Sequence, residues 1–70
     1  MKEVVIYGEY IQFDQFLKMM NFTSSGGQTA AFLASHKVLL NGIQVHEKKK
    51  KVRKDDKLTI DDETYVIVWG

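Results

Sequence analysis

The sequence predicts a single α+β domain of 70 residues, with a strand at the start, two packed helices after it and a β-rich second half. Three observations indicate this fold class. They are a β-branched opening segment, two segments with apolar residues at helical spacing, and alternating segments broken by Asn-Gly and Asp-Asp pairs. A chain this short buries only about 60% of its unfolded surface, so one small core is expected. We expect the second half to form a small antiparallel sheet of about four strands.

The first part of the chain carries the signals of one strand and one helix. Residues 4–7 are β-branched or aromatic, which is typical of a short strand. The next apolar residues recur at i, i+3, i+4 and i+7, on one face of a helix: Phe13, Phe16, Leu17 and Met20. This helix is expected to end near Asn21.

A second helix is expected after the pair Gly26-Gly27. Ser25 and Gln28 have the spacing of a capping box, in which each side chain bonds a backbone N–H at the start of a helix. Phe32 and Leu33 lie on its predicted inner face. Its other face is rich in alanine, at Ala30, Ala31 and Ala34.

The second half of the chain reads as strands and turns. Asn41-Gly42 readily takes the positive φ angles of a type I′ turn, so residues 38–40 and 43–45 are expected to form a hairpin. Further strands are expected around residues 58–60 and 65–69, after Asp-Asp turns. The predicted core is Phe16, Leu17, Phe32, Leu33, Val38, Leu40, Val45, Leu58, Ile60 and Val66. The sequence leaves the positions of Tyr10 and Trp69 open.

The positive charge is concentrated in one segment. Residues 48–54, the basic segment, hold six of the ten basic residues, and the other four stand against nine acidic residues. The net charge of +1 therefore divides into +6 on the basic segment and −5 elsewhere. Clustered Lys and Arg attract the nucleic-acid backbone, mainly through counterion release. A loop that serves only solubility is the alternative.

Several classes of chemistry have no support in the sequence. Without cysteine there is no disulfide and no thiolate zinc site, and His36 and His46 lack partners at metal-ligand spacing. Neither nucleotide-loop motif nor a nucleophile elbow is present. We therefore expect neither an enzyme nor a metal or cofactor site. The longest apolar runs fall short of a membrane span, so we expect a soluble cytoplasmic protein.

Four motifs in order carry a family resemblance: Phe13-Asp14-x-x-Leu17, Ser25, Val38-x-Leu40-Asn41-Gly42-x-x-Val45 and Asp55-Asp56-x-Leu58-x-Ile60. They resemble the S4 RNA-binding domain, most closely the small stand-alone bacterial S4 proteins of the YaaA type. The resemblance is strongest over residues 12–60. It implies an S4-like fold (the αL motif) over residues 1–70, in which two helices and a hairpin dock on structured RNA.

The chain departs from the family pattern at positions that are usually basic or glycine. Gln12 and Gly26 stand where arginines are typical, and His36 replaces a glycine. The outer face of the second helix is often basic in the family, whereas here it carries the three alanines. The helical part of the implied RNA surface therefore holds few cations.

Three groups of residues are predicted to contact RNA. The basic segment supplies an electrostatic arm: Lys48, Lys49, Lys50, Lys51, Arg53 and Lys54. The start of the second helix is predicted to hold a phosphate, with turn geometry alone as the alternative: Ser25, Gly26, Gly27 and Gln28. A third group lies near the helix-to-hairpin face: Lys18, Lys37 and Asn41.

The expected partner is structured RNA, either ribosomal, ribosome-associated or similar to transfer RNA, bound by a monomer. One alternative is a protein-interaction module that uses the face of Ala30, Ala31 and Ala34. The other is an accessory protein that binds DNA, because lysine contacts to phosphate do not distinguish the two sugars.

Overall fold

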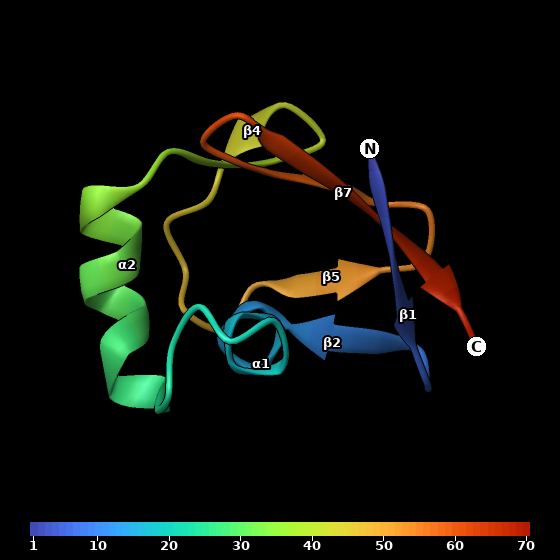
Figure 1. Ribbon diagram of the computed structural model, residues 1–70, viewed down its shortest axis with the longest axis horizontal. Helices are drawn as coiled ribbons and strands as arrows, with labels where there is room; N and C mark the ends of the chain where they lie inside the picture. Colours follow the sequence, from blue (N-terminus) through green and yellow to red (C-terminus); the bar gives the residue numbers. More distant parts are fainter.

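The computed structural model describes the backbone of residues 1–70 and the surroundings of every residue except Gly26. Figure 1 shows the arrangement of the elements. In chain order they are β1 (Lys2–Ile6), β2 (Tyr10–Gln12), α1 (Phe13–Met19), the 3-10 turn η1 (Gly26–Gln28), α2 (Thr29–Ser35), β3 (Val38–Leu40), β4 (Ile43–Gln44), β5 (Lys51–Arg53), β6 (Lys57–Ile60) and β7 (Glu63–Trp69).

The main sheet has five strands in the order β1-β7-β6-β3-β4. The α+β class and the predicted antiparallel sheet of about four strands are confirmed, since β7, β6, β3 and β4 pair antiparallel, but the arrangement differs because the first strand joins this sheet. β1 pairs in parallel with β7, with Val4 opposite Ile67, so the sheet is mixed. A parallel pair needs a long crossover connection, and here the helices and the other strands supply it. The first and last strands therefore lie side by side (Figure 1).

The structure also contains a second, two-stranded sheet, which the sequence did not predict. β2 and β5 pair antiparallel, with Tyr10 opposite Arg53 and Gln12 opposite Lys51. Val52, in the middle of β5, is fully buried although its neighbours in sequence are basic and exposed. The basic segment is therefore partly a strand rather than a free loop.

The core lies between the main sheet and the helices. Phe16 of α1 meets Tyr65 of β7 edge to face at 5.7 Å between ring centroids, and Phe13 meets Phe32 of α2 at 6.5 Å. Eight of the ten predicted core residues are buried. Leu33 and Val66 are only half-buried. On β7 the buried positions are Tyr65 and Ile67, because side chains alternate between the faces of a strand and the prediction took the wrong phase.

The local signals at the helix ends and the hairpin had different outcomes. The Asn41-Gly42 turn is confirmed, with φ of 52° and 85°. α1 ends at Met19, and Asn21 takes a left-handed φ of 64° just beyond it. The predicted capping box is shifted, because the side-chain oxygen of Gln28 accepts the backbone N–H of Ser24 at 2.7 Å. Gln28 itself is the N-cap of α2, since η1 precedes the helix.

Candidate nucleic-acid interface

The basic segment is fixed to the start of α1 by its backbone. The carbonyl of Lys50 accepts the N–H of Phe13 at 2.8 Å, and that of Lys48 accepts the N–H of Asp14 at 3.0 Å. The first N–H groups of a helix have no partner within the helix, so these bonds satisfy donors that would otherwise need water or a cap. Together with the buried Val52 and the pairing of β5 to β2, they hold the backbone in one path.

The cationic side chains of the basic segment point outward and remain available. All six are exposed: Lys48, Lys49, Lys50, Lys51, Arg53 and Lys54. The ion pairs found among the described residues join Lys2 to Glu63 and His36 to Asp61, so neither includes a residue of the segment. Six uncompensated charges on a fixed backbone form a concentrated positive surface.

The structure brings Gly27 and the basic segment together. Gly27 lines a hollow of about 300 Å³ with Lys48, Lys49 and Asp14. A Cβ on Gly27 would meet only Ser25 Oγ, at 4.0 Å, so the hollow is open there. The Asp14 carboxylate opposes an anion in the hollow, and the two lysines favour one.

Of the other predicted residues at the start of the second helix, Ser25 and Gln28 do not line this hollow. Ser25 and Gln28 are exposed, and the amide of Gln28 is engaged by Ser24. α2 has only seven residues and follows a single 3-10 turn, so its dipole contributes little to the binding of an anion. The surroundings of Gly26 lie outside the described residues, so its phosphate contact stays a prediction.

The third predicted group is dispersed. Lys18 is exposed in the last turn of α1, and Lys37 is exposed just before β3. No described contact joins either of them to the basic segment. Asn41 is occupied within the protein, since its Nδ2 donates to Asp56 Oδ1 at 3.0 Å and its Oδ1 accepts the N–H of Lys57 at 2.9 Å.

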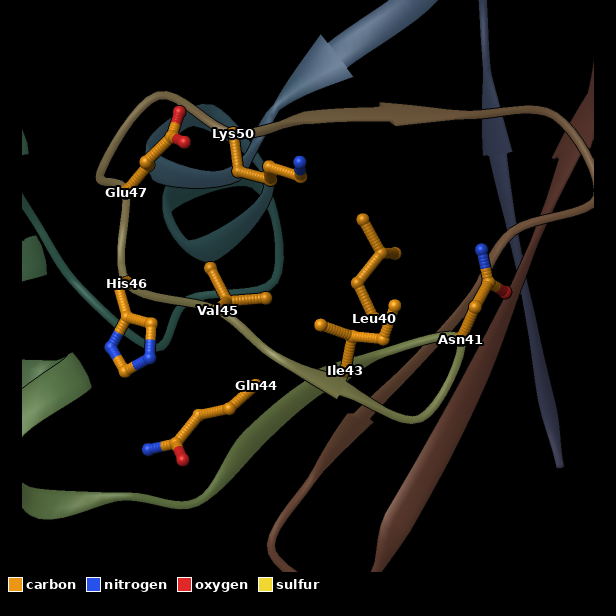
Figure 2. A pocket seen from close by; sticks show the side chains of 8 residues that line it. All are labelled: Leu40, Asn41, Ile43, Gln44, Val45, His46, Glu47 and Lys50. Carbon is orange, nitrogen blue, oxygen red and sulfur yellow. The ribbon is translucent and has the colours of Figure 1, made fainter.

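A second hollow connects the hairpin to the basic segment. Its volume is about 290 Å³, and Leu40, Ile43 and Val45 give it an apolar wall. Figure 2 shows the Lys50 side chain lying across this hollow from the hairpin. Asn41 lines it as well, and Asp56 also links Asn41 to the basic segment, because its carboxylate accepts hydrogen bonds from both the Asn41 Nδ2 and the backbone N–H of Arg53.

Aromatic side chains lie beneath the cations, which the sequence did not predict. Lys51 Nζ lies 4.9 Å from the ring centre of Tyr10, and the guanidinium carbon of Arg53 lies 5.8 Å from it. Lys54 Nζ lies 5.3 Å from the ring centre of Trp69. The only sequence signal was alternation within residues 51–53, which is short and was hidden by the surrounding lysines.

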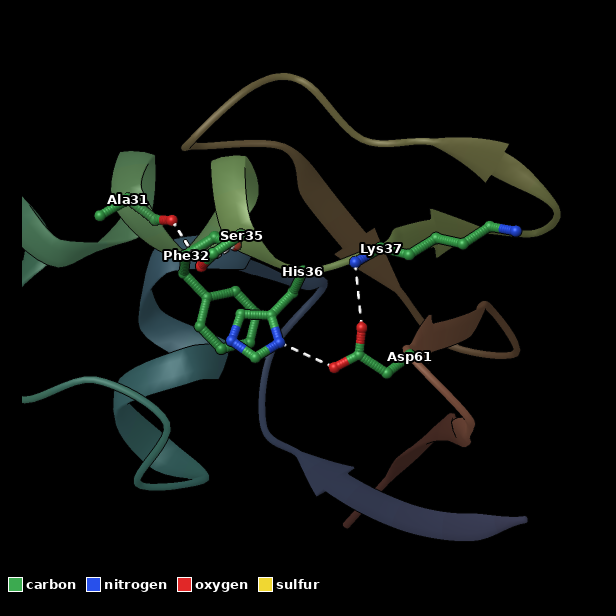
Figure 3. A network of polar contacts seen from close by, with 6 residues as sticks. All are labelled: Ala31, Phe32, Ser35, His36, Lys37 and Asp61. Carbon is green, nitrogen blue, oxygen red and sulfur yellow. Dashed lines mark hydrogen bonds and ion pairs between the residues drawn. The ribbon is translucent and has the colours of Figure 1, made fainter.

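His36 and Asp61 tie the end of α2 to the turn before β7 (Figure 3). His36 Nδ1 lies 2.7 Å from Asp61 Oδ2, and its ring stacks on Phe32 at 4.1 Å. The hydrogen bond with His36, followed by the bond from the Lys37 N–H, lowers the pKa of Asp61 below its ordinary value of 3.8. The described residues contain no cluster of three or more His, Cys, Asp or Glu side chains placed to hold a metal ion.

The exposed face of α2 matches its prediction, since Ala30, Ala31 and Ala34 are all exposed. Nothing in the described residues covers them, and a protein partner on this face stays a prediction. None of the described helices is long and apolar enough to cross a membrane.

Comparison with known proteins shows the family to which the chain belongs. A family model described as the S4 domain matches residues 4–68, which is nearly the whole chain. Neither a curated protein nor a solved structure matches the chain significantly. The matched range includes both helices and the basic segment, and it extends the resemblance first seen over residues 12–60. The chain belongs to the S4 domain family, whose members generally bind RNA.

Proposed function

We propose that this S4 domain binds structured RNA through the phosphate backbone, with the basic segment as the main contact. The observation that carries the proposal is the group of six exposed cations, none of which belongs to an ion pair among the described residues, on a backbone fixed by α1 and β2. Membership of a family that generally binds RNA supports it. The role is binding without catalysis.

The chemistry of the segment favours affinity over sequence reading. Five of its six cations are lysines, and a lysine is a point charge without the two-pronged geometry by which arginine recognises a base edge. Contacts to phosphate position a protein on nucleic acid and carry no sequence information. We propose ribosomal RNA, or a compact RNA similar to transfer RNA, in the cytoplasm as the ligand, because folded RNA presents a dense array of phosphates.

Salt dependence provides the first test. Each neutralised phosphate of a duplex contributes about −0.9 to the slope of log K against log salt, so six contacts give a slope of about −5. Affinity for a ribosomal RNA hairpin should fall about a thousandfold between 50 and 200 mM salt. Fluorescence anisotropy over a salt series measures this slope. A slope near zero would contradict the proposal.

Charge reversal locates the contact. K48E/K49E removes two cations and leaves the backbone carbonyl of Lys48 in place, so the fold is expected to persist. The loss of two phosphate contacts predicts a fall in affinity of about fiftyfold at 0.1 M salt and a slope shallower by about 2. K2E/K57E is the matched control, because it changes net charge equally at exposed lysines outside the segment. Equal losses in the two variants would indicate only a general charge effect.

Two rival functions have distinct outcomes. If the exposed alanine face of α2 binds a protein, partners recovered from cells will persist after nuclease treatment. If the ligand is DNA, a DNA hairpin of matched sequence will compete as well as the RNA hairpin, because phosphate contacts alone do not read the 2′-hydroxyl.

A further inference from the structure

Three aromatic side chains form an exposed edge at one end of the molecule. Tyr7 follows β1, Tyr10 begins β2 and Trp69 ends β7, and their exposed fractions are 83%, 39% and 56%. Figure 1 shows that the end of β1, the start of β2 and the ends of β5 and β7 lie together on this side. We call Tyr7, Tyr10 and Trp69 the aromatic edge. Large aromatic side chains are costly to leave exposed, so three at one end indicate a binding surface.

The aromatic edge is continuous with the basic segment. Lys51 and Arg53 lie over the ring of Tyr10, and Lys54 lies over that of Trp69, at 4.9, 5.8 and 5.3 Å. These cations belong to the surface proposed above to hold phosphates. A nucleic-acid strand whose phosphates contact residues 51–54 would therefore carry its bases next to exposed rings.

A hollow opens between two of the rings. Tyr7 and Trp69 line a space of about 310 Å³ together with Ile6, Gly8, Glu9 and Gly70. Gly8 has a φ of 105° and no atom within 4 Å of where a Cβ would stand, so its side of the hollow is open. The carboxylate of Glu9 disfavours a phosphate in this space and can accept hydrogen bonds from the amino group of a base.

We propose that the aromatic edge stacks an unpaired nucleobase of the RNA held by the basic segment. The proposal rests on the function proposed above and defines its ligand further. Bases within a duplex are already stacked and paired, whereas unpaired bases in loops, bulges and ends can stack on aromatic side chains. The preferred ligand is therefore a duplex with an adjoining single-stranded nucleotide, with its phosphates on the lysines and one base against Trp69 and Tyr7.

Three RNA ligands of equal duplex sequence test the proposal. One hairpin is blunt, one carries a three-nucleotide overhang, and one carries the same overhang with abasic sugars, which keeps the phosphates and removes the bases. Stacking of one base predicts binding of the normal overhang about five- to 150-fold tighter than the abasic one. Trp69 is the only tryptophan, so its fluorescence reports directly on this edge and should be quenched by the normal overhang alone.

Substitutions at Trp69 separate stacking from simple apolar contact. W69F keeps an aromatic face and should retain most of the gain from the overhang. W69L keeps a large apolar side chain without a ring and should lose the gain, measured as the ratio of its affinities for the normal and the abasic overhang. Quenching in the unmodified protein gives a readout that does not depend on either variant folding.

The outcomes distinguish the two proposals. Equal affinity and equal quenching with normal and abasic overhangs would overturn the stacking site and leave backbone binding intact. A gain that persists in W69L would also overturn it. Failure to bind any of the three RNAs would overturn both the stacking site and the proposed function.

Discussion

The clearest perturbation of the basic segment is Val52→Ala. Val52 is fully buried in the middle of β5, between the exposed Lys51 and Arg53. The substitution removes two buried methyl groups, at about 0.8 kcal/mol each, and adds the cost of the cavity that they leave. We expect the free energy of unfolding to fall by roughly 2–3 kcal/mol, out of the roughly 4–10 kcal/mol that is typical of a domain this size.

Urea unfolding followed by Trp69 fluorescence measures this change. The matched control is Val5→Ala on β1, where the side chain is 45% exposed and the same two methyl groups are lost. Exposed substitutions of this kind usually change stability by less than about 0.5 kcal/mol. If V52A were as mild as V5A, the basic segment would not be anchored through Val52, and the account of a fixed cationic surface would be wrong.

The other predictions concern three further sites. Because the folded pKa of Asp61 is lowered, its charged form stabilises the protein fully above the ordinary pKa of 3.8, and this contribution is lost as pH falls through the lower folded pKa. In acid unfolding series, the stability difference between the unmodified protein and D61N should therefore shrink only below about pH 4. G27K adds a cation to the hollow lined by Lys48 and Lys49, so RNA should bind up to about eightfold tighter at 0.1 M salt than to the G27A control. N41G keeps the turn geometry and loses the two side-chain bonds, to Asp56 Oδ1 and from the Lys57 N–H, so urea unfolding should show a loss of about 1–3 kcal/mol while the affinity of the folded protein for RNA is unchanged. A large loss of affinity would instead place Asn41 at the RNA.

Local signals in the sequence predicted much of the fold. The Asn41-Gly42 hairpin was correct because the positive φ angles of a type I′ turn select these two residues directly. The apolar spacing in α1 identified Phe16 and Leu17 as core residues, because a helix face repeats over several turns. Features encoded within one element were therefore accessible from the sequence.

Features that depend on distant pairing were not accessible. The parallel pairing of β1 with β7 joins opposite ends of the chain, and no local pattern specifies it. β2 and β5 have three residues each, too few for alternation to stand out among the lysines. On β7 a run of apolar residues fits either phase, so only packing decides that Tyr65 and Ile67 face inward.

The candidate site shows the same division. The cations of the basic segment and their exposure were predicted, since charge runs are usually solvated. Their proximity to Gly27, and to the rings of Tyr10 and Trp69, depends on tertiary contacts such as the bonds from Phe13 and Asp14 to the segment. The sequence did not predict that the Asn41 side chain bonds within the protein, because its partners, Asp56 and Lys57, lie beyond the basic segment in sequence.

The bonds between α1 and the basic segment use backbone atoms alone, so this part of the fold does not depend on the charges of the lysine side chains. The N–H groups of Phe13 and Asp14 donate to the backbone carbonyl groups of Lys50 and Lys48. Every amino acid has such a carbonyl group. The side chains at positions 48–50 can therefore vary while the scaffold keeps its path. RNA affinity can be raised or lowered one lysine at a time, by natural variation or by design, at little cost to the stability of the domain.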